Sequence, residues 1–492
     1  MKFTRALHGM PRRLAVLQLF AVLVVAAAAA ADNRALLDAV ETGDAAAVRA
    51  LLAGDANANA AGPDGTSALH WAAHRDDLEI TTALIAAGAR VDAVNRYGVT
   101  PLYLASENGN AALVETLLDG GADPDTASPE GETALMTAAR AGNAATVRLL
   151  LARGAGVDAT EGWKGQTALM WAAAENNAEA VRTLLASGAD INVRSAGGEF
   201  TPLMFAVRGG AIDSTRALLD AGADPNETML EGTSMLVLAT INAHWELAGV
   251  LLDYGADPNA DAQGWTALHQ IAWSRRWNRG FNLPGPSQTG DLDSLDLVRL
   301  LVARGADVNT RQKQEPKDGN RNKLNRIGAT PFLLAAKSAD VPLMRVLLEQ
   351  GADPAITTER GVTALMAAAG VGIWAPGENP GTHEEALAAV RLAYEVGGGA
   401  ITDVDRDGET ALHGAVYRGG AIPVIEFLAA RGADLDAVNS KGWMPVTAAD
   451  GVEYTPAVLK RYPDVAALLR SLMREQGLPV PPSTQPGRTT DQ

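Results

Sequence analysis

The 492-residue chain contains no cysteine, and this absence removes several kinds of chemistry at once. Disulfide bonds, thiolate zinc sites, covalent haem attachment, cysteine nucleophiles and lipid anchoring through cysteine are all excluded. Aromatic residues are also scarce, at 5% of the chain, although hydrophobic residues make up 47%. Alanine and leucine supply most of the apolar material, which suits short helices that pack closely.

Sequence motifs that usually mark an enzyme are missing as well. We find no phosphate-binding glycine loop, no Gly-x-Ser-x-Gly elbow and no His-Glu-x-x-His pair. The chain has only seven histidines. One of them, His383, precedes Glu384 and Glu385 in a run that could bind a metal, but acidic residues there also favour the start of a helix. We therefore predict no catalytic residue, no metal and no cofactor.

Basic residues are outnumbered by acidic ones beyond the start of the chain. The net charge is −17, and residues 1–31 carry four basic and no acidic side chains, so the remainder has a net charge of −21. A body this acidic repels phosphates, which argues against nucleic acid as a partner.

The first 31 residues have the pattern of a secretory signal peptide. A basic segment at 2–13 precedes an apolar run at 14–28, and small residues end at Ala31. We predict cleavage near Ala31 and a periplasmic or secreted body with no further membrane contact. The alternative is an uncleaved inner-membrane anchor, because an apolar run of about 18 residues is at the short limit for a spanning helix.

A glycine followed by a Thr-(Ala/Pro)-Leu-type tetrapeptide recurs along the chain, usually after 33 or 34 residues. A fixed period of this size predicts stacked repeats, each packing only on its neighbours. In the unit at 165–193, a first helix is expected after Thr167 and an amphipathic second helix is expected to end at Gly188. The recurring glycines are Gly65, Gly98, Gly131, Gly165, Gly198, Gly232, Gly264, Gly328, Gly361, Gly408 and Gly442.

These units resemble the ankyrin repeat, whose signature joins Gly-x-Thr-Pro-Leu-His to a later Leu-Leu-x-x-Gly-Ala-Asp-x-Asn. Thr100-Pro101-Leu102 matches the first part, and Leu252 to Asn259 matches the second. The resemblance covers about residues 33–475. It implies an all-α solenoid of helix-turn-helix units with β-hairpin-like fingers. It also implies that the signature histidines bond neighbouring turns together; they are His70, His269 and His413.

The period predicts the domain organisation. Three insertions interrupt the repeats, and long loops in a compact array are usually functional or disordered. The predicted parts are a signal peptide at 1–31, an N-terminal capping unit at 32–62, ten repeats at 63–441 with insertions near 275–292, 311–326 and 370–382, a C-terminal capping unit at 442–475, and a disordered tail at 476–492.

Ankyrin proteins bind partners through their fingers and through the concave face of their first helices. The resemblance therefore marks the aromatic residues at the finger tips as contact candidates, and aromatic residues are common hot spots. The alternative is that these rings pack between adjacent fingers. The candidates are Tyr97, Trp163, Phe200, Trp265 and Trp443.

The insertions supply further candidates. The second, at 311–326, has a net charge of +4, which fits either a loop paired with the acidic body or a loop that attracts anions or clamps a partner. We expect the first and third insertions to meet across the repeat between them. Their candidate contact residues are Arg275, Arg276, Trp277, Arg279, Phe281 and Trp374.

The chain is similar to bacterial exported ankyrin proteins, and this resemblance implies a non-catalytic scaffold that binds a protein partner. We expect it to be monomeric. One alternative is an enzyme or small-ligand binder whose site lies on the insertions. The other is an inhibitor or secreted effector that wraps another protein.

Overall fold

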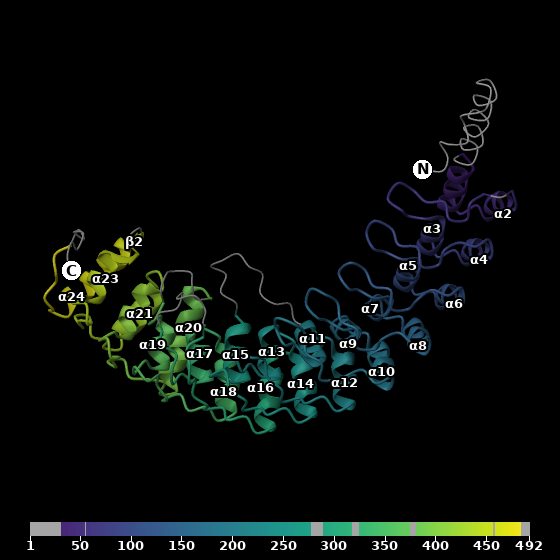
Figure 1. The fold of residues 1–492 in the computed structure, drawn as a ribbon. Helices are drawn as coiled ribbons and strands as arrows, with labels where there is room; N and C mark the ends of the chain where they lie inside the picture. The colour runs from purple at the N-terminus through teal and green to yellow at the C-terminus, as the bar shows by residue number, and fades with distance from the viewer. Residues whose placement is uncertain are drawn as a thin grey trace, which may run out of the picture. The chain divides into compact units, whose positions relative to one another are not determined.

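The computed structural model describes residues 31–54, 56–276, 289–316, 324–373, 380–455 and 458–483. The chain divides into two units, Met1–Ala223 and Asp224–Gln492. Each unit consists of stacked pairs of short helices joined by turns and extended fingers (Figure 1). The predicted all-α solenoid is confirmed.

The first unit opens with a helix over 31–42, which is paired with α2 (Ala45–Ala53). The pairs that follow are α3 (Ala68–His74) with α4 (Leu78–Ala86), α5 (Pro101–Asn108) with α6 (Ala111–Asp119), α7 (Ala134–Arg140) with α8 (Ala144–Ala152), α9 (Ala168–Ala174) with α10 (Ala178–Ala186), and α11 (Pro202–Gly209) with α12 (Ile212–Asp220).

The second unit continues the pairing and ends in a different way. Its pairs are α13 (Met235–Ile241) with α14 (Trp245–Asp253), α15 (Ala267–Ser274) with α16 (Ser294–Ala303), α17 (Pro331–Lys337) with α18 (Val341–Glu349), α19 (Ala364–Ala369) with α20 (His383–Glu395), and α21 (Ala411–Tyr417) with α22 (Ile422–Ala429). In the last pair, a two-stranded antiparallel hairpin of β1 (Val452–Thr455) and β2 (Val458–Lys460) separates α23 (Pro445–Asp450) from α24 (Pro463–Glu475). The sequence analysis did not anticipate this hairpin.

The signature threonine or serine starts the first helix of each repeat. Thr133 Oγ1 accepts a hydrogen bond from the Met136 N–H at 3.3 Å, and Thr410 Oγ1 accepts one from the His413 N–H at 3.4 Å. Such a cap satisfies a backbone donor that the helix itself leaves without a partner. Proline follows the cap in some repeats, as at Pro101, where its fixed φ favours the first helical position.

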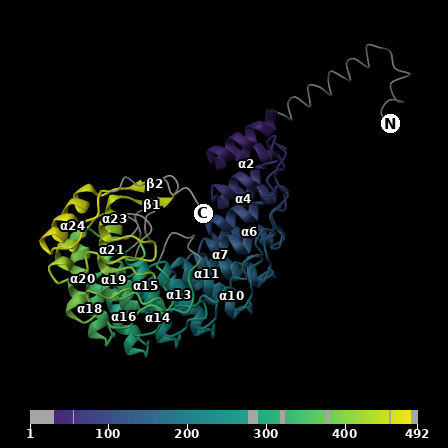
Figure 2. The same cartoon turned by 90° about the vertical axis from the view of Figure 1, so that its left-hand side faces the viewer.

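Within each unit, the first helices line up in one row and the second helices in another (Figures 1 and 2). Each first helix contacts the first helix of the next repeat, as α5 contacts α7 and α19 contacts α21. The contact surfaces are mostly alanine, leucine and valine, and the alanines allow the helices to approach closely. A core built this way grows by nearest-neighbour contacts.

The signature histidines join neighbouring repeats, as the resemblance implied. The Nδ1 atoms of His70 and His413 accept hydrogen bonds from the backbone N–H of Ser67 and Thr410. The His413 Nε2 atom lies 3.0 Å from the carbonyl oxygen of Trp443 in the next finger.

The third of these histidines shows how the array accommodates its insertions. His269 Nε2 lies 3.1 Å from the carbonyl oxygen of Ala329, which is 60 residues further along the chain. Burial lowers the pKa of His269 to about 4, so its ring is neutral at physiological pH. Helices α15 and α17 also contact each other directly. The extra residues therefore leave the stack without interrupting it.

Candidate functional site

Two of the candidate aromatic side chains are exposed at the tips of their fingers. The exposed fraction is 83% for Trp163 and 64% for Tyr97. Each follows a residue whose side chain organises the turn. The Tyr97 N–H donates to Asn95 Oδ1 at 3.0 Å, and the Trp163 N–H donates to Glu161 Oε2 at 2.6 Å. The turns hold both rings outward, and the Lys164 Nζ atom lies 4.8 Å from the Trp163 ring centroid.

Glu161 shows how firmly such a turn is held. Burial of its carboxyl group disfavours the charged form, but the backbone N–H groups of Gln166, Trp163 and Lys164 donate to it and hold its pKa below the ordinary value. A carboxylate with three backbone donors fixes the path of the chain around it.

The remaining three aromatic candidates pack on neighbouring side chains. The Phe200 ring lies 5.6 Å from the Phe205 ring, and the Trp265 ring lies 5.6 Å from the Trp273 ring. Trp443 is half-buried and has the Lys441 Nζ atom 4.9 Å from its ring centroid. These rings contact residues of their own repeat, whereas the sequence analysis considered packing between adjacent fingers.

The described arginines of the first insertion are held by the rest of the second unit. Arg275 Nε lies 2.9 Å from Asp340 Oδ2. Arg276 donates to the carbonyl oxygens of Ser338 and Ala339, at the end of α17, and its Nη2 atom lies 2.7 Å from Glu385 Oε1. The other insertion candidates, Trp277, Arg279, Phe281 and Trp374, lie outside the described residues.

A described arginine of the first insertion contacts the helix that follows the third insertion. Arg276 belongs to the first insertion, and Glu385 lies in the first turn of α20, the helix that follows the third. The second insertion also reaches the third, because the Leu324 N–H donates to the carbonyl oxygen of Gly372 at 3.1 Å. The second insertion thus contacts the third, and the first contacts the helix that follows the third.

The described part of the basic insertion is paired within the protein. Lys313 Nζ lies 2.6 Å from Asp261 Oδ2, and Arg326 Nη2 lies 3.0 Å from Glu315 Oε2. Arg311 donates to the carbonyl oxygen of Thr357 at 2.9 Å. Lys313 thus pairs with an acid of the body, Arg326 pairs within the insertion itself, and Arg311 bonds a backbone carbonyl group. Residues 317–323 lie outside the described part.

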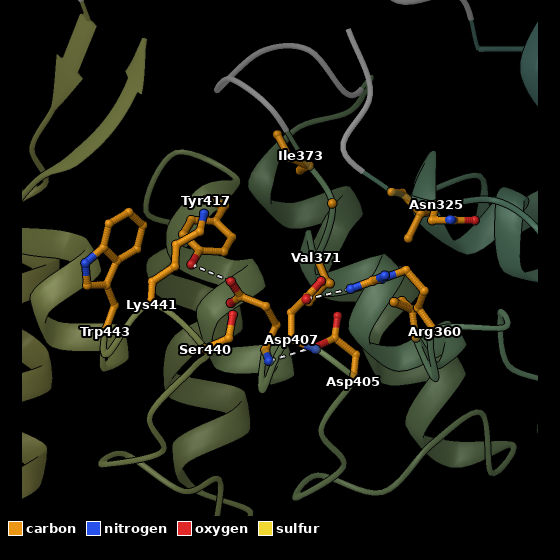
Figure 3. Close-up of a pocket in the computed structure, with 14 residues that line it drawn as sticks. Asn325, Arg360, Val371, Ile373, Asp405, Asp407, Tyr417, Ser440, Lys441 and Trp443 are labelled. Atoms are coloured by element: carbon orange, nitrogen blue, oxygen red, sulfur yellow. Dashed lines mark hydrogen bonds and ion pairs between the residues drawn. The ribbon is translucent and has the colours of Figure 1, made fainter. Parts of the chain in front are cut away.

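A cavity of about 320 Å³ lies in the second unit, beside the second and third insertions. Figure 3 shows Arg360 and Asn325 on one side, Lys441 and Trp443 on the other, and Asp405 and Asp407 between them. The apolar part of the wall comes from the side chains of Leu324, Val362, Val371 and Ile373. The volume is at the lower end of the range of about 300–1,000 Å³ for ligand pockets.

Glu409 is the most buried acid of this cavity, with 14% of its side chain exposed. Its Oε1 atom accepts hydrogen bonds from Tyr417 Oη and Asn439 Nδ2, each at 3.0 Å. Its Oε2 atom is buried without a hydrogen-bond partner. Burial raises the pKa of Glu409 to about 7, against the lowering effect of the two donors, and the neighbouring charge of Asp405 raises it further.

The two aspartates of the cavity differ in their partners. Asp407 Oδ1 lies 2.6 Å from Arg360 Nη2, so its charge is paired. Asp405 Oδ1 accepts from the backbone N–H groups of Asp407 and Glu409, both at 2.9 Å. Burial raises the pKa of Asp405 in spite of these bonds. The backbone of this finger is thus built around a carboxylate that feels the charge of Arg360 but forms no ion pair among the described residues.

Asp403, Asp405, Asp407 and Gly408 have the spacing that opens a calcium-binding loop. The geometry does not support a calcium site. Asp403 Oδ2 accepts from the Ala400 N–H at 2.7 Å, and the other two carboxylates have the partners given above. No group of three acidic, histidine or cysteine side chains in the described ranges could hold a metal ion.

Trp443 is the one lining residue of this cavity among the candidates predicted from the sequence. The sequence pattern that could have indicated the cavity is the alternation of Asp405, Asp407 and Glu409, because residues two apart in an extended segment share one face. Tyr417, at the end of α21, and Lys441, in the next finger, could not have been added to it from spacing alone.

The fold and the fingers together define a helical-repeat binding scaffold, and comparison with known proteins names its family. Residues 36–128, 112–195 and 203–312 match the family model of ankyrin repeats in three copies, and residues 327–359 and 407–440 match that of the single ankyrin repeat. The chain belongs to the ankyrin repeat family. Its repeats form a protein–protein interaction scaffold of a type that is usually non-enzymatic.

Similar solved structures include the crystal structure of the human ASB11 ankyrin repeat domain. It is 27% identical, the match covers 45% of this chain and 98% of that chain, and the TM-score is 0.41. No curated protein matches the sequence. Within the described ranges, no helix is long and apolar enough to span a membrane.

Proposed function

We propose that this chain is an exported, monomeric scaffold that binds a protein partner through its finger tips and the adjoining first helices. The observation that carries the proposal is the exposure of Trp163 and Tyr97, at 83% and 64%, on turns fixed by buried or half-buried acceptors. Rigid aromatic side chains lose little conformational freedom when a partner covers them, and they contribute much of the energy of binding interfaces.

Exposed apolar residues at a repeated finger position also favour the fingers as the contact surface. Val94, Val404 and Val438 each stand four residues before a signature glycine, and more than half of each side chain is exposed. Single exposed apolar residues are common on proteins. Because these valines recur at one position of the repeat, we infer that the fingers form a contact surface for a partner.

Binding can be tested by cross-linked capture from a periplasmic extract of the native host, comparing the wild type with the double variant Trp163→Ala/Tyr97→Ala. We expect one partner to be retained by the wild type and lost by the double variant. The matched control is Tyr254→Ala, because Tyr254 is an aromatic residue with 38% exposure that follows a second helix rather than lying on a finger. Equal capture by all three proteins would contradict the proposal.

Export rests on residues 1–31, whose basic segment, apolar run and small-residue end are the parts of a signal peptide. Expression in a Gram-negative host followed by fractionation tests it. We expect a periplasmic protein whose first residue is Asp32. Full-length protein in the membrane fraction would favour the anchor, and full-length protein in the cytosol would refute export.

A further inference from the structure

Two of the carboxylates that line the cavity of the second unit form no ion pair. Arg360 pairs with Asp407, and neither Asp405 nor Glu409 makes an ion pair with an arginine or lysine among the described residues. A carboxylate that is largely removed from water and lacks a cation is unfavourable unless a partner supplies the charge or the group takes up a proton.

The nearest basic ring cannot supply this charge. His413 Nδ1 lies 3.9 Å from Glu409 Oε2, but it accepts a hydrogen bond from the Thr410 N–H. The other ring nitrogen, Nε2, lies 3.0 Å from the Trp443 carbonyl oxygen. Because a carbonyl oxygen only accepts, Nε2 must carry the proton of this hydrogen bond. Burial also lowers the pKa of His413. The ring is therefore neutral. Lys441 and Arg360 also line the cavity, and their charges lower the pKa of Glu409 and of Asp405 respectively, but neither forms an ion pair with these two carboxylates.

The walls of the cavity favour a flat cation with an aliphatic stem. Val371, Ile373 and Leu324 line one part of it, and the rings of Tyr417 and Trp443 line another. An arginine guanidinium is planar and weakly hydrated, stacks on aromatic faces and bonds carboxylates with two parallel N–H groups. A lysine ammonium is compact and strongly hydrated, so it gains less from aromatic walls.

We propose that this cavity receives an arginine side chain of the protein partner, with Asp405 and Glu409 compensating the guanidinium charge and Trp443 and Tyr417 flanking it. The inference rests on the proposed scaffold function and names the chemistry of one contact. Arginine is among the residues that most often dominate binding interfaces, and it does so when it fills a pocket.

The test is calorimetric titration of the purified full-length chain with N-acetyl-arginine-N-methylamide. The comparison probe is the citrulline analogue, which has the same shape without the charge. We expect saturable binding of the arginine probe and at least about tenfold weaker binding of the citrulline probe, because a site built around carboxylates rejects an uncharged analogue. Equal binding of both probes would overturn the proposal.

A matched pair of variants assigns the binding to the cavity. Glu132 follows a signature glycine as Glu409 does and also accepts a hydrogen bond from a tyrosine, but it belongs to the first unit. We expect E409Q to weaken arginine binding by at least about tenfold and E132Q to change it by less than about twofold. A folded E409Q protein with undiminished affinity would overturn the proposal. If E409Q does not fold, the comparison of the arginine and citrulline probes on the wild type still tests whether the cavity requires a charged guanidinium.

The affinity should also rise with pH. Guanidinium remains charged throughout, whereas Glu409, with a pKa of about 7, must be ionised to attract it. The groups that face Glu409 are Asp405, Tyr417, Asn439, Lys441 and the neutral His413. Binding at pH 6 should be up to about tenfold weaker than at pH 8. An affinity that is unchanged or falls over this range would count against the proposal.

Failure of this inference and failure of the scaffold can be told apart. A captured partner that depends on Trp163, with no arginine binding, overturns only the inference. Arginine binding without a captured partner supports the cavity and leaves the scaffold without support.

Discussion

The same five residues, Gly-Glu-Thr-Ala-Leu, occur at 131–135 in the first unit and at 408–412 in the second. The two copies have the same backbone conformation. Each glycine has a positive φ, of 88° at Gly131 and 73° at Gly408, and each threonine caps the helix that follows. Each glutamate accepts a hydrogen bond from a tyrosine hydroxyl.

Their surroundings differ. The tyrosine beside Glu132 is Tyr103, from the preceding repeat, whereas the one beside Glu409 is Tyr417, from the end of its own helix. Asn439 adds a second donor to Glu409, and burial raises the pKa of Glu409 to about 7. Identical local sequence thus gives the same backbone, while the chemistry of the glutamate follows from what the neighbouring segments place around it.

The largest expected effect concerns the contact between α21 and the third insertion. A Cβ atom at Gly414 would lie 2.5 Å from the Val371 N atom and 2.9 Å from the Gly370 C atom, which is too close. We expect Gly414→Ala to lower the free energy of unfolding by about 3 kcal/mol or more, because backbone must move to make room. Urea unfolding measures this change.

The control is the equivalent position in the first-unit repeat that opens at Gly131. Thr137 occupies it in α7, so the first unit already accommodates a larger side chain there. Thr137→Ala should lower the free energy of unfolding by no more than about 1 kcal/mol. Similar losses in the two variants would show that the insertion does not distinguish the two sites.

The next effect is a pH dependence of stability. Because the pKa of Glu409 is about 7 in the folded protein and ordinarily 4.5, the folded state keeps a proton that the unfolded chain releases between these values. The resulting stability is present below pH 4.5 and is lost as the pH rises through 7. Relative to E409Q, the wild type should lose up to about 3 kcal/mol over this range.

Urea unfolding of both proteins at pH 5 and pH 8 checks this prediction. Taking the difference between them removes the contribution of the buried histidines, which titrate in both. A constant difference would mean that the environment of Glu409 does not disfavour its charge.

The smallest expected effect comes from the exposed ion pair at the cavity. The Arg360 and Asp407 side chains are 39% and 48% exposed, so water and salt screen their attraction. Arg360→Ala should cost less than about 1 kcal/mol, and the cost should shrink in 1 M salt. A larger, salt-independent loss in thermal unfolding would identify Arg360 as part of the packing instead.

Much of the fold could be predicted from the sequence. The period located the helix pairs because each signature combines a capping residue, an apolar helix and a left-handed glycine, all of which act locally. The histidine bonds followed from the resemblance, since they repeat with the same period. The finger aromatics were harder. Trp163 and Trp265 look alike in the sequence, yet Trp163 is 83% exposed, whereas Trp265 is half-buried because it has Trp273 to pack on.

The sequence by itself determined the repeating unit, because caps, turns and amphipathic helices depend on residues within a few positions of each other. It also determined where the array is interrupted, through the two long intervals after Gly264 and Gly361. Only the tertiary structure decided that the second insertion contacts the third and that a cavity forms around Glu409. That cavity brings together side chains from residues 324 to 443, and burial and charge depend on such distant neighbours.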